Sequence, residues 1–374
     1  MSNEQNFVTS SCSDCREKIL LVLSRPLERS GITQIVMDLI AHSRDTIAFD
    51  VASFGYYFGY DEQLKKKGIR CYKLSEKKRV LSYMRDIYTI VKTSRYHKVY
   101  IHGNSSLMTL EALPCKLAGA KVFTHCHNTN PHEACFKYFF FKPFFNCLTD
   151  CRIACSKEAG DWAYIGKRII IHNGINISRF SYDKEVRAEI RKKLGLNEYC
   201  VVGHIGSFNK QKNHQRLISI FQEMIRIKPD VRLLLLGDGE LKERIVSDIR
   251  QSGLSEYVTL MDYVDNPEDY LQAMDVVILP SLFEGFCLSA LEAQVSGLPV
   301  IVSEAIPSAA YATDRCVRMN LKDSDREWAR KAMEMLNTER KDHSESVAKK
   351  GYDSKRMTDS IQNILLSGSS SLTE

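Results

Sequence analysis

Short apolar runs recur along the first half of the chain, and segments with helical spacing of apolar residues lie between most of them. A run of four to eight apolar residues bounded by turn residues is typical of a strand buried in a parallel sheet. The segment 32–41, whose apolar residues are three and four apart, is typical of the helices that connect such strands. The alternation predicts a parallel sheet with helices on both faces. The predicted strands are at residues 18–24, 47–53, 69–74, 98–102, 121–125, 152–154 and 168–172.

The second half of the chain repeats this pattern. Its predicted strands are at residues 199–205, 231–236, 258–261, 276–279 and 300–302. A chain of 374 residues has the length of two average domains, so we expect an α/β protein with two doubly wound domains. The expected organisation is an irregular tail at 1–17, domains at 18–179 and 180–355, and a last helix with a loose Ser-rich end at 356–374.

The strand–helix–strand pattern is clearest at residues 275–303. Their sequence is DVVILPSLFEGFCLSALEAQVSGLPVIVS. A buried strand at 276–279 is followed by a loop, by a helix whose apolar face includes Leu288 and Leu291, and by the next strand. Gly297 is placed as the cap that ends this helix. In a doubly wound sheet, a loop between a strand's carboxyl end and a helix N-terminus is where ligands bind.

Two carboxylates lie in this unit. Glu284 is in the loop, and Glu292 is eight residues further on, on the helical face of Leu288. A carboxylate beside a helix N-terminus can accept hydrogen bonds from the two hydroxyls of a ribose. The amides of residues 285–288 are donors suited to a phosphate. By spacing alone, however, two glutamates eight apart also occur on ordinary solvated helices.

This segment closely resembles the E-x7-E element of retaining glycosyltransferases with the GT-B fold, in which two Rossmann-like domains face each other across a cleft. The group is called family 4, or glycosyltransferase group 1. In that family the first glutamate lies near the donor sugar and the second binds the ribose of the nucleotide. The resemblance implies these roles for Glu284 and Glu292, and it implies a UDP-sugar as the donor.

Further motifs extend the resemblance. The stretch 170–180, IIHNGINISRF, is similar to the family's linker between domains, although Asn176 stands where the family commonly has Asp. The stretches GDGEL, AMDVVILPSLFEGF and GLPVIVS are most similar to enzymes of the exopolysaccharide or capsule type. In this fold, the helical pattern at 357–366 crosses back onto the first domain.

The loop after the first strand of the second domain reads GSFNKQKN. In the family this loop reads Gly-Arg…Lys, and both cations contact the donor diphosphate. Gly206 and Lys212 match that pattern. Ser207 stands at the place of the Arg and has neither its charge nor its planar fork. Either Lys210 or Arg216 replaces the missing cation, or the activity is low or absent.

The predicted strand at 121–125 runs into the sequence THCHN, with two histidines. The family has a His at this strand end, facing the donor sugar. The resemblance assigns that place to His127, with His125 as the alternative. We expect His127 to position the donor and to stabilise charge, because the donor phosphate itself can take the acceptor's proton in a retaining transfer. A satisfied core histidine is the structural alternative.

Gly31, at the start of the predicted helix 32–41, lets the backbone approach a ligand closely. The family usually has two adjacent glycines there. The residues expected to contribute to catalysis are His127, Lys212 and Glu284. The residues expected to bind the donor are Gly31, Gly206, Ser207, Lys212, Glu284, Gly285, Phe286, Cys287, Leu288 and Glu292.

Charge is unevenly distributed along the chain. Residues 1–178 hold 25 Lys and Arg against 16 Asp and Glu, whereas the whole chain has a net charge of +6. The excess is concentrated between residues 65 and 98 and is either a solvated helical face or a surface for anionic lipid headgroups. The aromatic segment 135–148 offers a similar choice, between a membrane interface and a buried packing segment. No nucleic-acid motif accompanies the basic face, so no nucleic-acid partner is expected.

The cysteines favour a reducing compartment. Many of the 12 Cys lie inside apolar runs, as reduced thiols do. Cys12 and Cys15 form a C-x-x-C in a polar tail, but zinc needs four ligands and no second pair follows, so no metal is expected. The N-terminus lacks the apolar core of a signal peptide, and no long apolar run occurs. We therefore expect a cytoplasmic protein, or one at the inner face of the membrane.

Together these features predict a metal-independent, retaining glycosyltransferase of the hexosyltransferase type. It would move a sugar from a UDP-sugar to a saccharide or lipid-linked saccharide in surface polysaccharide biosynthesis, with no cofactor. Two alternatives stay open. The departure at Ser207 favours a non-catalytic subunit that binds nucleotide sugars. A sugar-nucleotide 2-epimerase shares the fold, but it would need a carboxylate pair for acid and base catalysis, and only Glu284 and Glu292 are present in the predicted site.

Overall fold

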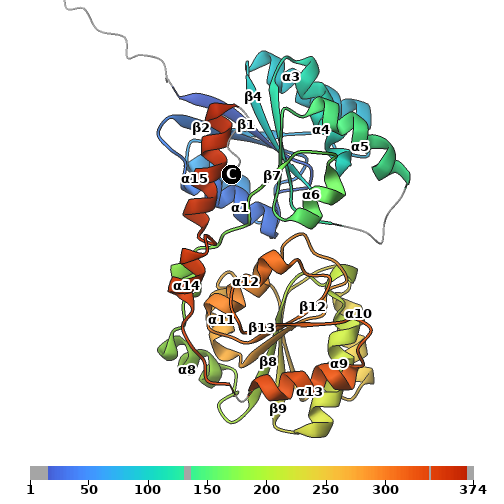
Figure 1. Cartoon of the computed structure of the whole chain (residues 1–374), viewed down its shortest axis with the longest axis vertical. Coiled ribbons are helices and arrows are strands. Elements are labelled where there is room, and N and C mark those ends of the chain that lie inside the picture. The colour runs from blue at the N-terminus through green and yellow to red at the C-terminus, as the bar shows by residue number, and fades with distance from the viewer. Residues whose placement is uncertain (1–15, 130–135, 337, 369–374) are drawn as a thin grey trace, which may run out of the picture.

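Two parallel β-sheets with helices packed against them make up the chain in a computed structural model, which describes residues 16–129, 136–336 and 338–368. The two domains lie one above the other along the long axis of the molecule (Figure 1). This arrangement confirms the predicted pair of doubly wound α/β domains. Most of the tail predicted at 1–17 lies outside the described residues.

The first domain has a seven-stranded sheet in the order β3-β2-β1-β4-β5-β6-β7, and every neighbouring pair is parallel. Its elements in chain order are β1 (Glu17–Leu23), α1 (Gly31–Ala41), β2 (Ile47–Ser53), α2 (Tyr60–Lys66), β3 (Cys71–Lys73), α3 (Val80–Thr93), β4 (Lys98–Gly103), η1 (Ser106–Met108), α4 (Thr109–Leu117), β5 (Lys121–Cys126), α5 (Phe136–Leu148), β6 (Cys151–Ala154), α6 (Lys157–Ala163) and β7 (Ile169–Ile170).

The second domain has a six-stranded parallel sheet in the order β10-β9-β8-β11-β12-β13. Its elements, with the last helices of the chain, are α7 (Ile177–Phe180), α8 (Lys184–Lys193), β8 (Cys200–Ile205), η3 (Lys210–Lys212), α9 (His214–Ile227), β9 (Val231–Leu236), α10 (Lys242–Gln251), β10 (Val258–Met261), α11 (Pro267–Ala273), β11 (Val276–Leu279), α12 (Leu288–Val295), β12 (Val300–Ser303), η4 (Ser308–Ala310), β13 (Cys316–Met319), α13 (Asp325–Leu336), α14 (Ser344–Lys349) and α15 (Ser354–Ser367).

Strand β1 explains why the central strands read as continuous apolar runs. Leu20 and Val22 pack into one hydrophobic cluster, while Ile19, Leu21 and Leu23 pack into another on the opposite side of the sheet. Both faces of the strand are therefore buried, and polar residues have no place on either face. The central strands were predicted correctly for this reason.

Three of the four edge strands differ from the predictions, whereas the fourth, β10, lies at the predicted residues 258–261. The predicted strands 69–74 and 168–172 shorten to β3 and β7, which are the two edges of the first sheet. The edge strand β13 was not predicted at all. An edge strand has one neighbour and its residues are only partly covered, so its sequence shows no continuous apolar run.

The strand order places two loops of the second domain at one point. The order reverses between β8 and β11, which are neighbours in the sheet. The loop 206–213 follows β8, and the loop 280–287 follows β11. Their starting points are therefore adjacent at the carboxyl edge of the sheet, where doubly wound domains bind ligands.

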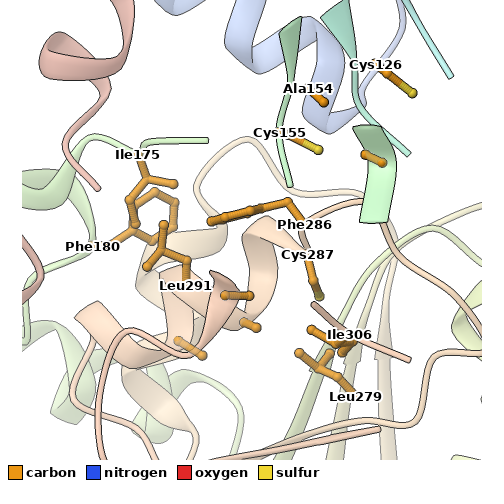
Figure 2. Close-up of a cluster of buried hydrophobic side chains, with 14 of the residues drawn as sticks. Cys126, Ala154, Cys155, Ile175, Phe180, Leu279, Phe286, Cys287, Leu291 and Ile306 are labelled. Atoms are coloured by element: carbon orange, nitrogen blue, oxygen red, sulfur yellow. The ribbon is translucent and has the colours of Figure 1, made fainter. Parts of the chain in front are cut away.

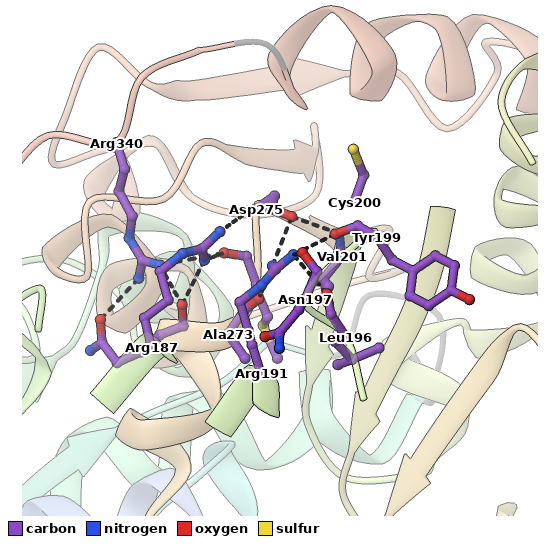
Figure 3. Close-up of polar contacts among 12 residues, drawn as sticks. Arg187, Arg191, Leu196, Asn197, Tyr199, Cys200, Val201, Ala273, Asp275 and Arg340 are labelled. Carbon is purple, nitrogen blue, oxygen red and sulfur yellow. Dashed lines mark hydrogen bonds and ion pairs between the residues drawn. The ribbon is translucent and has the colours of Figure 1, made fainter. Parts of the chain in front are cut away.

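A network of arginines around Asp275 anchors the start of β11 (Figure 3). The Asp275 carboxylate accepts hydrogen bonds from Arg187 at 2.6 Å, from Arg191 at 3.2 Å and from the amide of Val201 at 2.7 Å. Arg340 donates to the carbonyl of Gln272 and to other carbonyls nearby. These contacts tie α8 and the segment after α13 to the strand that carries the loop 280–287.

A hydrophobic cluster joins the two domains (Figure 2). Phe286, from the loop before α12, is 1% exposed and lies 6.0 Å, ring centre to ring centre, from His172. The same cluster contains Cys126 and Cys155 from the first domain and Leu291 from the second. The domain junction is thus a packed core, and it holds the loop 280–287 against the first domain.

Helix α15 lies on the first domain, beside α1 (Figure 1). Its residues Ile361 and Leu365 are buried in the cluster that covers β1. The chain therefore crosses between the domains twice. The two crossings pair at Ile175, whose amide donates to the carbonyl of Tyr352 at 2.9 Å. In the part of the chain that is described, no helix has both the length and the hydropathy needed to cross a membrane.

Candidate functional site

Glu284 is the centre of a buried polar cluster at the carboxyl edge of the second sheet. Its side chain is buried, and its Oε1 accepts a hydrogen bond from Nζ of Lys212 at 2.7 Å. Its Oε2 accepts a hydrogen bond from Nε2 of Gln211 at 2.8 Å. Both donors come from the loop 206–213 after β8. The Glu284 carboxylate therefore holds this loop against the loop 280–287 after β11.

Lys212 keeps its positive charge in this buried place. Burial alone would lower the pKa of its ammonium group, but the adjacent Glu284 carboxylate more than offsets this and raises the pKa above its ordinary value. The backbone is fixed as well, because the amide of Lys212 donates to the side chain of Asn209 at 3.2 Å. A cation is therefore held at the expected phosphate position before any ligand binds.

Glu292 lies one helical turn after Leu288 and is half-buried. Its carboxylate makes no hydrogen bond or ion pair with any residue that the structure describes. Burial raises the pKa of Glu292 to about 7, although the nearby Arg179 guanidinium acts in the opposite direction. A half-buried carboxylate that lacks a partner is ready to accept hydrogen bonds from a ligand.

The N-terminus of α12 completes the second-domain side. Cys287 caps this helix with a φ of 78°, a left-handed conformation that costs energy for a residue other than glycine. The amides of residues 285–288 donate no hydrogen bond within the described part of the chain. They are free for an anion, as is expected at a helix N-terminus.

The first domain approaches this helix at two points. A Cβ atom on Gly285 would lie 2.0 Å from the carbonyl oxygen of His127, and one on Gly31 would lie 3.1 Å from Cδ1 of Leu288. Only glycine fits at position 285, and a side chain at position 31 would push Leu288 away. Both expected glycines therefore allow close contact between the domains beside the expected donor site.

His127 and His125 occupy different places. His127 follows the last residue of β5, is 7% exposed, and lies beside the Glu284–Gly285 loop through its carbonyl. Its ring turns toward β4, where its Nε2 lies 3.0 Å from Nδ1 of His102. His125 is fully buried and bonds through Nδ1 to the hydroxyl of Tyr100 at 2.8 Å. Of the two, His127 is nearer the junction.

Position 207 lacks the cation that the family has in this loop. Ser207 is exposed, and Lys210 is exposed as well. Arg216 donates to the carbonyls of Leu321 and Asp323 in the segment before α13. Its guanidinium is engaged there, whereas the Lys210 side chain has no such partner among the described residues, so Lys210 is the better placed of the two candidates.

Three residues of the site were not predicted from the sequence. Asn128 donates to Oε1 of Gln211 at 3.2 Å, and Thr129 donates to the carbonyl of Glu284 at 3.0 Å. Together with Gln211 they link the two domains across the site. Their positions in the sequence could have indicated this role, because Asn128 and Thr129 closely follow β5 and Gln211 directly precedes Lys212.

Another contact between the domains lies beside the site. The Arg29 guanidinium is 3.0 Å from the Asp265 carboxylate and lies over the rings of Phe58 and Tyr263, at 4.3 and 3.9 Å from their centres. Arg29 and Phe58 belong to the first domain, and Asp265 and Tyr263 belong to the second. This contact holds the domains together near the N-terminus of α1.

Comparisons with known proteins agree with this architecture. Residues 186–354 match the family model described as glycosyl transferases group 1. The Bacillus subtilis protein described as "Putative glycosyltransferase EpsF" is 24% identical over 93% of this chain and 96% of its own length. An Escherichia coli enzyme, UDP-Gal:alpha-D-GlcNAc-diphosphoundecaprenol alpha-1,3-galactosyltransferase, is 27% identical over 58% of this chain and 60% of its own length.

Solved structures share the fold. The crystal structure of Anabaena HepE in complex with UDP-glucose has a TM-score of 0.78 at 17% identity and covers 93% of this chain and 99% of its own. The structure of WaaG, a glycosyltransferase of lipopolysaccharide biosynthesis, has a TM-score of 0.74 at 13% identity and covers 93% of this chain and 99% of its own. At this identity the similarity concerns the fold, and it confirms the expected two-domain GT-B architecture.

Proposed function

We propose that this chain, a relative of the group 1 glycosyltransferases, transfers a sugar from a UDP-sugar to a hydroxyl of a saccharide acceptor with retention of the anomeric configuration. The observation that carries the proposal is the unpartnered Glu292 carboxylate, which shares one edge of the sheet with the Lys212 ammonium group and the free amides at the start of α12. These three groups suit the ribose and the diphosphate of a nucleotide sugar.

The donor would bind with its ribose hydroxyls on Glu292 and its diphosphate between Lys212 and the amides of residues 285–288. Lys212 is paired with Glu284 in the structure. The diphosphate would therefore share this cation with Glu284, and Glu284 would then be held close to the sugar. The carbonyl contact between His127 and Gly285 closes the first-domain side of the sugar site.

In the transfer step, the bond between the anomeric carbon and the β-phosphate oxygen breaks. The acceptor oxygen forms the new bond on the same face of the sugar, and the acceptor's proton passes to the released diphosphate. Lys212 and the helix amides stabilise the charge that develops on this leaving group, so no metal ion is required for that purpose. We assign to His127 the positioning of the sugar rather than proton transfer.

Relatives suggest the type of acceptor. The Escherichia coli galactosyltransferase acts, by its name, on a sugar linked to diphosphoundecaprenol. A lipid-linked acceptor in surface polysaccharide biosynthesis would be consistent with a membrane-facing first domain. Helix α5 exposes three aromatic side chains, and α3 exposes Leu81 next to basic residues such as Arg85. We propose peripheral contact with the membrane through these helices.

One observation favours a second candidate function. Ser207 is exposed, and Arg216 is committed to carbonyls elsewhere, so the family's second cation has no fixed replacement. A non-catalytic subunit that binds nucleotide sugars would have such a site. It would bind UDP as predicted and would transfer nothing.

Incubation of the purified protein with a panel of UDP-sugars and native lipid extract tests both candidates. We expect UDP release that depends on the extract, an axial or equatorial product linkage that matches the donor, and full activity in EDTA. UDP binding without turnover for every donor would favour the non-catalytic subunit. Formation of an epimeric nucleotide sugar without any acceptor would instead indicate a 2-epimerase.

A further inference from the structure

Three histidines gather on one face of the first sheet, at the end nearest the second domain. His125 and His127 are two residues apart on β5 and its extension, so their side chains point to the same face. His102 is the direct partner of His125 on the neighbouring strand β4. The ring centres of His125 and His127 are 3.9 Å apart, and those of His102 and His127 are 5.2 Å apart.

This cluster is buried and poorly satisfied. His102 and His125 are fully buried, and His127 is 7% exposed. Each ring has one nitrogen with no hydrogen-bond partner in the described structure, namely Nε2 of His102, Nε2 of His125 and Nδ1 of His127. A buried polar atom without a partner costs about 1–3 kcal/mol, so three in one cluster call for an explanation such as a bound ion.

The ring nitrogens lie near one another, and the rings must draw closer together for all three to bind one ion. One ring nitrogen from each histidine can be chosen so that all three lie within 4.8 Å of one another. Zinc binds imidazole nitrogens at roughly 2.0–2.1 Å in tetrahedral geometry, which requires nitrogens about 3.3 Å apart. Nδ1 of His102 and Nε2 of His127, 3.0 Å apart, form a hydrogen bond with each other, so the nitrogens left for an ion are the three without a partner in the described structure. Tyr100 holds the third ring through its hydroxyl, as residues behind metal ligands do.

We propose that His102, His125 and His127 form a binding site for one Zn²⁺-class transition-metal ion, with a fourth position on the side of the domain junction. Imidazole ligands favour zinc and its neighbours over magnesium or calcium, which prefer oxygen. The ion is separate from the diphosphate site, where Lys212 provides the positive charge. No cysteine is among the proposed ligands of this ion.

If the chain has the proposed transferase function, an ion at this site should affect the rate of transfer. His127 is the side chain assigned to the donor sugar, and a metal ion bound to its ring holds it on the sheet. Zinc should therefore lower the rate of sugar transfer. The zinc effect should disappear in His102→Gln, and it is measured against that variant's own rate without zinc because His102 hydrogen-bonds to His127.

Metal binding is measured first, independently of activity. Protein freed of metal by a chelator and desalted is titrated with Zn²⁺, and in parallel with Co²⁺. We expect one ion per chain and the visible absorption of tetrahedral cobalt without the sulfur-to-cobalt charge-transfer band that a cysteine site gives. His102→Gln and His125→Gln should bind at least about 100-fold more weakly. Two controls should bind as the wild type does: His97→Gln, at an exposed histidine, and Cys12→Ser/Cys15→Ser.

A measurement on the wild type covers the case in which a buried variant fails to fold. The chain has 10 His, and a nitrogen-15 spectrum of the histidine rings follows them all. Zinc should shift three of them. No binding by the wild type, a cobalt spectrum with thiolate absorption, or equal binding by all histidine variants would overturn the site. Binding without loss of transfer activity would overturn only the inhibition.

Discussion

At the scale of single residues, Glu292 combines a half-buried position with the lack of a partner in the described structure. Since burial raises its pKa to about 7, the folded chain holds this proton more tightly than the unfolded chain does. The ionised form therefore costs stability above pH 7. A ligand that donates hydrogen bonds to the carboxylate would recover that cost, as expected at a binding site.

Glu292→Gln should weaken UDP binding and stabilise the ligand-free protein at pH 8. Loss of a charge-assisted hydrogen bond is worth roughly 1.5–3 kcal/mol, or about 10- to 100-fold in affinity. Between pH 6 and pH 8 the two proteins should differ in the pH dependence of UDP affinity, because Glu292 ionises only in the wild type while the terminal phosphate of UDP ionises with both. Calorimetry across this range checks both points. Glu243→Gln, at an exposed position, is the control. Unchanged UDP affinity in Glu292→Gln would remove Glu292 from the site.

Lys212→Ala should nearly abolish transfer. The ammonium group is the cation fixed at the predicted phosphate position, and loss of one such contact costs about 10²- to 10³-fold in rate. Lys210→Ala changes a lysine two residues away, whose side chain is exposed and makes no ion pair with a described residue. Steady-state rates of Lys212→Ala and Lys210→Ala show how much each lysine contributes to transfer. If Lys212→Ala keeps the wild-type rate, the assignment of the phosphate site is wrong.

Ser207→Arg should raise kcat, or leave it unchanged if Lys210 or Arg216 already provides the second cation. Residue 207 directly follows Gly206 at the end of β8, and an Arg there can present its planar fork to phosphate oxygens. Ser207→Ala is the control and should have the wild-type rate. If the wild type is inert with every donor and Ser207→Arg gains turnover, the non-catalytic function becomes the better interpretation of the natural chain.

At the scale of elements, α5 departs from one of the two interpretations of its sequence, the buried packing segment. The segment is helical despite Pro143, and Phe145 is buried under it, whereas Phe139, Phe140 and Phe144 are 77%, 64% and 63% exposed. A packing segment would bury these rings. These positions are one, four and five residues apart, so the three rings span an arc of about 140° on one side of the helix. Exposed aromatic rings on one side of a helix suit a membrane interface.

Replacement of Phe139, Phe140 and Phe144 by Ser should reduce binding to vesicles that contain anionic lipid, with little change in folding stability, because these rings bury little area. Sedimentation with vesicles measures the binding. Ile227→Ser, at an apolar residue of the second domain that is 51% exposed, is the matched control. Equal sedimentation of the triple variant and the wild type would exclude α5 as the membrane contact.

At the scale of the whole molecule, the two domains share one core through Phe286. Phe286→Ala should cost about 3–5 kcal/mol and should lower hydrogen-exchange protection in both domains, because the ring contacts both. Phe221→Ala removes an equally buried ring from a cluster inside the second domain, so its effect should stay there. Exchange measured by mass spectrometry distinguishes the two. Protection lost only in the second domain in Phe286→Ala would contradict a shared core.

The sequence by itself determined the two sheets and the unit that carries the site. Strand β11, helix α12 and strand β12 follow from local patterns, since strands buried on both faces must be apolar throughout and helices end at glycine. The places of Glu284, Glu292 and Lys212 relative to strand ends followed from the same patterns. The edge strand β13 was missed because its partial burial leaves no such pattern, although the edge strand β10 was predicted at its observed residues.

Only the tertiary structure decided which side chains meet. The pairing of Lys212 with Glu284, the commitment of Arg216 to the segment before α13, and the stacking of His102 on His127 all join residues far apart in the chain. Periodicity assigns a residue to a face of its own element, but it does not say which residue of another element lies opposite. That depends on strand order and on the docking of one domain against the other, which the packed core around Phe286 fixes.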